Sequence, residues 1–382
     1  MRRPHRYLYV SCFANDFIFA YAFYTVLFSI RGLSTMEISS VLAFWALAAG
    51  VLEVPTGALA DYLGRKQVVA IAPLVRSLCF VSWYFARGNA LLYGLGFLFW
   101  GLSEALLSGS WEALVYDSLK ARGEEHTYEQ VNGRMLALSD GASAAGMVVG
   151  GLLTPLGMEN VCLLSLPALV VASAAVLPLE EPRRTKAEGR GLRQYAEYFR
   201  LAWREIRTNS TLRFVVLAQL GVGILGTLEE YDQLYYQEAG IPLMLIGATG
   251  GVFFGLRSVA AMMAHRLKGS YWPLPLLTLI AGVLVVGSAV RLSIPALAPL
   301  LVAYMAGAAV RVLLEGRMQA CVGSTARATV TSAASLFWCG IGVGEMLLLG
   351  WISRFFGIPG IYVAGGVYAL AFGLWLLARR TD

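Results

Sequence analysis

The chain has 382 residues, of which 58% are hydrophobic and 14% are charged, whereas a soluble domain has about 25% charged residues. This composition argues against a soluble globule. Twelve bilayer-spanning helices of about 20 residues would take about 240 residues and leave about 140 for loops, so the length fits a many-span membrane protein. The meaning of the formal net charge of +6 depends on which loops hold the basic residues, because lysine and arginine in loops set the orientation of a membrane protein.

Apolar stretches recur along the chain with short polar segments between them. They lie at residues 7–30, 36–60, 68–87, 90–116, 129–154, 160–178, 212–237, 243–264, 273–290, 296–319, 329–353 and 358–378. We predict that these twelve stretches are transmembrane helices of an all-α membrane protein. A basic start precedes the first stretch, as in a signal peptide, but Asn15 and Asp16 interrupt its apolar core. It is therefore interpreted as the first helix.

Residues 179–211 form the long connector of the chain and divide it into six plus six stretches. This arrangement is typical of two repeated helical bundles. We expect an N-terminal bundle over 1–178, a cytoplasmic linker over 179–211 and a C-terminal bundle over 212–382. Within the linker, residues 192–207 place four arginines along one stripe, which predicts an amphipathic helix on the inner leaflet. A solvated, charged linker helix is the alternative.

Lysine and arginine are divided unevenly between alternate loops. One side holds Arg2, Arg3, Arg6, Arg65, Lys66, Lys120, Arg122, the cluster over 183–213, Arg266, Lys268, Arg327, Arg379 and Arg380, and the other side holds Arg31, Arg87, Arg291 and Arg354. By the positive-inside rule, both termini and the linker are expected in the cytoplasm. The basic excess thus indicates topology and not nucleic-acid binding. We expect a monomer in a bacterial inner membrane.

A glycine-containing motif stands between the second and third stretches. It reads Gly57-Ala58-Leu59-Ala60-Asp61-Tyr62-Leu63-Gly64-Arg65-Lys66. Gly64 allows the chain to reverse within a few residues, and Arg65 and Lys66 favour a cytoplasmic loop. The segment resembles the G-x-L-A-D-x-x-G-R-K signature that the major facilitator superfamily carries at this place, except that Tyr62 replaces a residue that is usually basic.

The resemblance implies the major facilitator fold, with two six-helix bundles. It also implies a conformational latch, in which Asp61 contacts the start of the eleventh helix near Thr329 in the outward-open state. The latch candidates are Gly57, Asp61, Gly64, Arg65 and Lys66. The antiporter signature of the family's fifth helix is half present as Gly141, Gly146, Gly150 and Gly151, with Gly151 in place of a proline. The arginine that many proton antiporters carry in the fourth helix is absent, and Glu104 stands beside its position.

Glycines of the fifth and eleventh stretches are expected to let backbones approach closely. In the fifth stretch these are the four glycines of the antiporter signature. In the eleventh stretch they are Gly340, Gly342 and Gly344.

Ionisable residues at membrane depth are costly unless they face a cavity or a partner, so they are candidates for function. In the family, helices 1, 4, 7 and 10 surround the central cavity. The resemblance therefore implies four residues that bind substrate or couple protons, namely Asp16, Glu104, Glu230 and Arg311. Three-four spacing in the seventh stretch puts Glu230 on a polar stripe and leaves Glu229 and Asp232 off it. Secondary candidates are Trp111, Glu112, Asp140, Arg257 and Glu345.

Several of these residues also have a structural interpretation. Arg311 and Glu315 are four residues apart and can neutralise each other, and Arg76 can pair with a nearby acid. Asp140 and Glu345 can instead serve at the interface of glycine-rich helices. Tyr235 and Tyr236, near an outer end, are expected to be lipid-belt anchors.

The predicted function is secondary active transport of a small molecule by alternating access. The surplus of acids favours proton-coupled efflux of a cationic or amphipathic compound. Proton-coupled uptake of a neutral or anionic metabolite, held by Arg257 or Arg311, is the alternative, as is a transporter-like sensor or a passive channel. An enzyme is disfavoured because HExxH and GxSxG are absent, and an ATP-driven pump because GxxxxGK[ST] is absent. We expect no cofactor and no metal.

Overall fold

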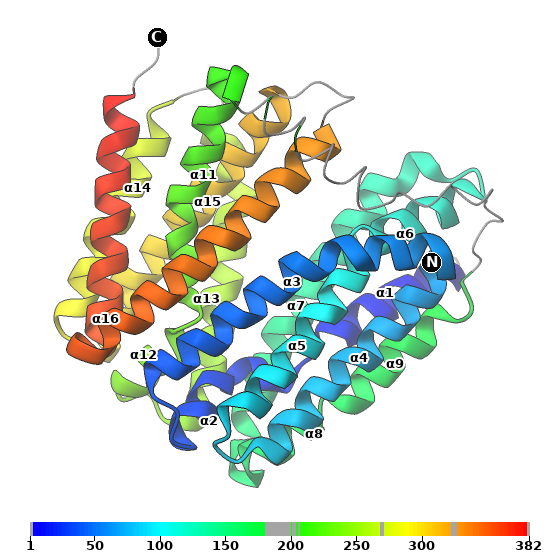
Figure 1. Cartoon of the computed structure of the whole chain (residues 1–382), viewed down its shortest axis with the longest axis horizontal. Coiled ribbons are helices and arrows are strands. Elements are labelled where there is room, and N and C mark those ends of the chain that lie inside the picture. Colours follow the sequence, from blue (N-terminus) through cyan, green and yellow to red (C-terminus); the bar gives the residue numbers. More distant parts are fainter. Residues whose placement is uncertain are drawn as a thin grey trace. The chain divides into compact units, whose positions relative to one another are not determined.

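The structure is a computed structural model, which describes residues 3–179, 200, 204, 207–267, 271–321 and 327–379. Within these ranges, the side chains of residues 3–5, 54, 58, 61, 319–321 and 327–337 are outside the description. All regular elements of the described residues are helices (Figure 1), which confirms the all-α prediction. Most of the predicted amphipathic helix at 192–207 lies outside the described residues.

Up to residue 179, the elements follow the six predicted stretches. They are α1 (Arg3–Asp16), η1 (Phe19–Ala22), α2 (Tyr24–Ile30), α3 (Thr35–Leu63), α4 (Arg65–Ala86), α5 (Ala90–Leu107), α6 (Ser110–Lys120), η2 (Glu125–Thr127), α7 (Tyr128–Leu152), η3 (Thr154–Leu156), α8 (Met158–Leu163) and α9 (Leu166–Val176). Gly64, between α3 and α4, has φ of 102°, a backbone conformation that glycine adopts readily. This supports the predicted reversal of the chain at Gly64.

From residue 210 onward, the elements follow the last six predicted stretches. They are α11 (Ser210–Glu229), α12 (Asp232–Glu238), α13 (Leu243–Met263), η4 (Ala264–Leu267), α14 (Pro273–Val290), η5 (Ile294–Ala296), α15 (Leu297–Cys321) and α16 (Arg327–Ala378). In the described part of the chain, ten helices are long and apolar enough to cross a membrane. The last, Trp338–Ala378, holds two predicted spans on either side of Gly357, and the first predicted span is divided among α1, η1 and α2.

The chain forms two compact units. Unit 1 comprises Met1–Gly32, Phe44–Tyr195 and Leu243–Gly251, and unit 2 comprises Leu33–Ala43, Ala196–Pro242 and Val252–Asp382. The first part of α3 therefore belongs to unit 2, and the first part of α13 belongs to unit 1. The predicted domain bounds, 1–178 and 212–382 around the linker, remain a prediction. They do not assign Leu33–Ala43 to unit 2 or Leu243–Gly251 to unit 1.

The first predicted span is not a continuous helix. It breaks after Asp16, and the backbone N–H of Phe19 donates to the Ser165 hydroxyl at 3.0 Å. A backbone group freed at membrane depth needs such a partner. The backbone of this segment packs directly against two glycines of α7. A Cβ on Gly150 would lie 2.1 Å from the Phe19 carbonyl oxygen, and a Cβ on Gly146 would lie 2.7 Å from the Ile18 carbonyl oxygen.

Two further spans are broken. The fourth ends its first part, α5, at Leu107 and restarts as α6 after Gly109, whose φ is 68°. The seventh breaks at residues 230–231, between α11 and α12. Membrane transporters commonly bind substrates and ions at such discontinuous helices. The three breaks lie within a few residues of Asp16, Glu104 and Glu230.

The glycines of the eleventh stretch have open surroundings among the described residues. No heavy atom of the described residues lies within 4 Å of the Cβ positions of Gly340, Gly342 and Gly344, nor of Gly141 in α7. The close approach in α16 is at Gly350, where a Cβ would lie 2.4 Å from the Cβ of Ser39. Glycine composition does not specify which face of a helix meets a neighbour, so the close approach expected at Gly340, Gly342 and Gly344 stays a prediction.

Candidate functional site

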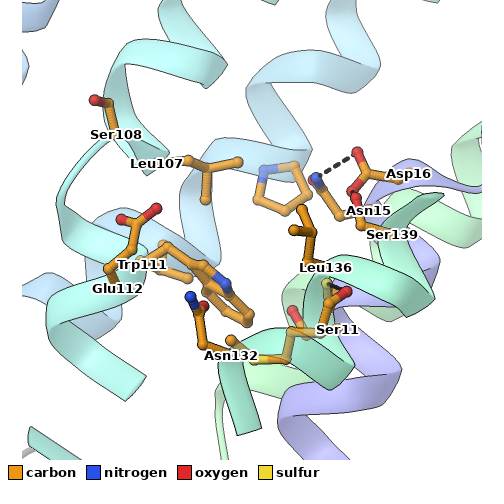
Figure 2. Close-up of a pocket in the computed structure, with 14 residues that line it drawn as sticks. Ser11, Asn15, Asp16, Leu107, Ser108, Trp111, Glu112, Asn132, Leu136 and Ser139 are labelled. Atoms are coloured by element: carbon orange, nitrogen blue, oxygen red, sulfur yellow. Dashed lines mark hydrogen bonds between the residues drawn. The ribbon is translucent and has the colours of Figure 1, made fainter. Parts of the chain in front are cut away.

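A polar pocket of about 330 Å³ lies within unit 1, at the breaks of the first and fourth spans. Figure 2 shows its walls, which come from α1, α4, α5, α6, α7 and the turn after α5. The lining residues are Ser11, Cys12, Asn15, Asp16, Val69, Pro73, Leu107, Ser108, Trp111, Glu112, Asn132, Met135, Leu136 and Ser139. Three predicted site residues, Asp16, Trp111 and Glu112, are thus brought together.

The described residues of the pocket wall include two carboxylates and no basic side chain. Asp16 and Glu112 lie on opposite sides of the pocket in Figure 2. Asp16 is held in place, since its Oδ2 accepts from the Ser139 hydroxyl at 2.5 Å and its Oδ1 from the Asn15 amide at 3.2 Å. Glu112 is exposed at the start of α6. The wall therefore favours a positive charge in the space between them.

A buried arginine lies behind Asp16. The side chain of Arg76, on α4, is 4% exposed, and its guanidinium lies 3.5 Å from Asp16 Oδ1 and 3.3 Å from the Asn15 carbonyl oxygen. This confirms the prediction that Arg76 pairs with a nearby acid. The ring of Trp100 lies 5.5 Å from the guanidinium, within reach of a cation–π interaction.

Glu104 lies deeper in unit 1, outside the pocket wall. Its two oxygens accept from the indole N–H groups of Trp100 at 2.9 Å and Trp45 at 3.0 Å. Arg76 interacts electrostatically with both Glu104 and Asp16. Arg76 thus contacts Asp16 directly, and Trp100 contacts both Arg76 and Glu104. Asp140, which follows Ser139 on α7, is half-buried and does not line the pocket.

Unit 2 contains an acid that the sequence interpretation set aside. Asp232 is 8% exposed. Its carboxylate accepts hydrogen bonds from three tyrosine hydroxyls, those of Tyr304 at 2.6 Å, Tyr362 at 2.8 Å and Tyr236 at 3.2 Å. Tyr235 and Tyr236 are 0% and 1% exposed, so the prediction that they anchor the protein in the lipid belt was wrong. The second part of the broken span turns these side chains into unit 2.

The other predicted residues of the seventh and tenth spans do not meet at a pocket described in unit 2. Glu230 is half-buried in the turn between α11 and α12. Arg311 is exposed and points toward Gly226, with one guanidinium nitrogen 3.9 Å from the position of a Cβ there. It forms no ion pair with the residues that the structure describes, so the structural alternative, in which Glu315 neutralises Arg311, was wrong. Glu315 accepts from the Gln219 amide at 2.9 Å instead.

Two secondary candidates of unit 2 have structural partners. Arg257 forms an ion pair with Glu229 and lies 4.9 Å from the ring of Phe254. Glu345 is buried and accepts from the Thr227 hydroxyl at 2.6 Å. These contacts are typical of packing within unit 2. Glu229, which the spacing left off the polar stripe, has a structural partner in Arg257.

The latch motif is described in part. Arg65 forms an ion pair with Asp117 of α6 at 2.8 Å, a contact that ties α4 to the fourth span. Gly57 and Lys66 are half-buried. The Asp61 side chain and that of Thr329 lie outside the described residues, so the latch stays a prediction. Among the residues that the structure describes, no cluster of three or more His, Cys, Asp or Glu side chains fits a metal ion.

The many apolar helices are those of a multi-pass membrane protein, and the pocket among the broken spans is a candidate site for a small molecule. The sequence model of the Major Facilitator Superfamily matches residues 7–344. The chain belongs to this superfamily of membrane transporters, and it is a transporter and not an enzyme. The major facilitator fold and the resemblance of the loop motif are thereby confirmed.

Solved structures of the same fold are similar over nearly the whole chain. A mutant of the nucleoside transporter NupG has a TM-score of 0.81 at 11% identity, covering 99% of this chain and 100% of that one. A POT family transporter in complex with 5-aminolevulinic acid has 0.73 at 9%, covering 98% and 96%. A bacterial homologue of the human lysosomal transporter Spinster has 0.70 at 16%, covering 99% and 96%. No curated protein sequence matches the chain.

Proposed function

We propose that the chain is a secondary active transporter that moves a small cationic compound by alternating access and couples this movement to protons. The observation that carries the proposal is the pocket of unit 1, where Asp16 and Glu112 lie in the wall and none of the described lining residues is basic. Arg76 balances the charge of Asp16 from behind, which leaves the wall with the negative charge of Glu112. A cationic group in the pocket restores neutrality.

The pocket also indicates what else the compound carries. A volume of about 330 Å³ falls at the lower end of the range for small-molecule sites. Trp111 offers an indole face for a cation or an aromatic ring, and the hydroxyls of Ser11 and Ser108 and the amide of Asn132 offer hydrogen bonds. Similar structures include a nucleoside transporter and a transporter with 5-aminolevulinic acid bound. These features support an amine with a small polar or aromatic body.

Glu104 and Glu230 are proposed to carry the protons. Glu104 accepts hydrogen bonds from two neutral indole donors, and Glu230 stands at the break of the seventh span. Both are therefore positioned where a carboxyl can gain and lose a proton as the bundles alternate. Glu104→Gln and Glu230→Gln keep the size of the side chain but cannot titrate, so each should abolish proton-driven accumulation.

Counterflow in proteoliposomes tests the substrate class. Vesicles loaded with unlabelled tyramine, a small aromatic amine, should take up labelled tyramine faster than empty vesicles do, whereas uridine and glutamate should not exchange. Asp16→Asn and Glu112→Gln should each lower this exchange about tenfold, equivalent to about 1.4 kcal/mol. Glu129→Gln, an exposed acid on α7, is the matched control and should exchange normally. Exchange of uridine or glutamate in place of tyramine would reject a cationic substrate.

Uptake of an anionic metabolite is the second candidate, and the exposed guanidinium of Arg311 favours it. In that case glutamate exchange should depend on Arg311 and not on Glu112. The export direction predicted from the sequence is tested in the same vesicles by imposing a proton gradient of either sign. Flux that does not saturate and is not accelerated by internal substrate would indicate a channel.

A further inference from the structure

Arg76 has fewer partners than a buried guanidinium normally has. A guanidinium has five N–H donors, yet the contacts of Arg76 to Asp16 and to the Asn15 carbonyl oxygen both involve the same nitrogen, at 3.5 and 3.3 Å. Its Nε is buried and has no hydrogen-bond partner among the described residues. A buried charge is stable only when it is well paired and hydrogen-bonded. The observed arrangement therefore leaves Arg76 held loosely by Asp16.

A second acid lies within reach of the same aromatic surface. Trp100 packs against the guanidinium of Arg76 and donates its indole N–H to Glu104 at 2.9 Å. The other oxygen of Glu104 accepts from Trp45 at 3.0 Å. Both donors of Glu104 are neutral, so a direct pairing with Arg76 would add a charge-assisted hydrogen bond. Two acids thus lie near Arg76: Asp16, which lines the pocket, and Glu104, which does not.

Asp16 both lines the pocket and pairs with Arg76. Figure 2 shows its carboxylate beside Asn15, and its side chain is 21% exposed against 4% for Arg76. A cationic group that enters the pocket reaches Asp16 from the open side, while Arg76 reaches it from the closed side. The two cations compete for one carboxylate.

We propose that Arg76 is a positioning residue that occupies Asp16 while the pocket is empty and transfers to Glu104 when the cationic group of the substrate binds Asp16. This inference rests on the proposed function. In this view, the side chain of Arg76 moves along the face of Trp100 when the pocket is occupied. Binding at Asp16 thereby changes the charge environment of Glu104. Pairing with Asp16 also makes Arg76 a competitor that lowers the affinity of the pocket for cations.

A ligand-free experiment tests the transfer itself. Asp16→Asn removes the charge that holds Arg76 and so imitates an Asp16 already neutralised by a substrate. Tryptophan emission of the purified full chain should then shift, because the hydrogen bonds of Trp100 and Trp45 to Glu104 change. The shift should be absent in Asp16→Asn/Arg76→Gln and reduced in Asp16→Asn/Trp100→Phe. An emission spectrum of Asp16→Asn equal to that of the wild type, or a shift that persists without Arg76, would overturn the proposal.

A binding experiment tests the competition, with tyramine as the probe and calorimetry as the readout. Arg76→Gln should bind tyramine about tenfold more tightly than the wild type, within the range usual for coupled sites, but should lose proton-coupled exchange. Arg76→Lys should restore coupling in part, and its retained fold can be checked by size exclusion. A purely structural arginine would instead weaken binding and exchange together, which would contradict the proposal. If tyramine binds neither protein, the proposed substrate class fails, and the emission experiment still decides on the transfer.

Discussion

Replacing Tyr304 with phenylalanine should destabilise unit 2 by about 2 kcal/mol. Its hydroxyl donates to Asp232 at 2.6 Å, the shortest of the three phenol contacts, and a hydrogen bond to a charged group contributes about 1.5–3 kcal/mol. Tyr362 lies at 2.8 Å and Tyr236 at 3.2 Å, the last longer than the usual maximum of about 3.0 Å for such bonds. The expected order of cost is therefore Tyr304→Phe, then Tyr362→Phe, then Tyr236→Phe at about 0.5–1 kcal/mol.

Reversible unfolding in mixed micelles, with dodecyl sulfate as the denaturant, gives the free energy of unfolding of each variant. Tyr62→Phe is the matched control, because its side chain is 80% exposed, and it should change this free energy by less than about 0.5 kcal/mol. Equal costs for the three buried tyrosines, or a cost for Tyr304→Phe no larger than that of the control, would refute the view that the carboxylate of Asp232 organises them.

Three further predictions concern packing and topology. Gly150→Ala should lower the melting temperature, because its Cβ would lie 2.1 Å from a carbonyl oxygen and overpacking costs about 1–3 kcal/mol, whereas Gly141→Ala, in open space, should leave it unchanged or raise it. Alkaline phosphatase fused within residues 183–190 or after the last residue should be inactive, and activity at either place would disprove the cytoplasmic assignment. Asp61→Asn should reduce transport without reducing membrane expression, and single cysteines at the cytoplasmic ends of the fourth and tenth spans should react faster; normal transport with unchanged labelling would reject the latch.

The apolar spans could be predicted from the sequence because each helix in a bilayer has to satisfy its backbone internally. Hydropathy is therefore a local signal, and the predicted stretches match the helices closely. The breaks could not be predicted in this way. The break after Asp16 depends on the Ser165 hydroxyl, which accepts from Phe19 across 146 positions of sequence. No window of the sequence contains both partners.

The choice of Glu230 over Asp232 shows how one break affects a whole pattern. Three-four spacing assumes a continuous helix, but α11 ends at Glu229 and α12 begins at Asp232. Residues beyond the turn no longer follow the register of those before it. Asp232 is therefore buried among tyrosines, although the spacing left it off the polar stripe. Asp16, by contrast, was found as a candidate because it is an acid in an apolar stretch, which a single position reveals.

The composition of unit 1 has a consequence for the order in which the protein is made. Unit 1 includes Leu243–Gly251, and a Cβ on Gly247 would lie 2.0 Å from the Met147 carbonyl oxygen. These residues are synthesised after the whole of the connector and the seventh span. Since chains enter the membrane from the N-terminus onward, the ribosome has added more than half of the protein before unit 1 has all its parts.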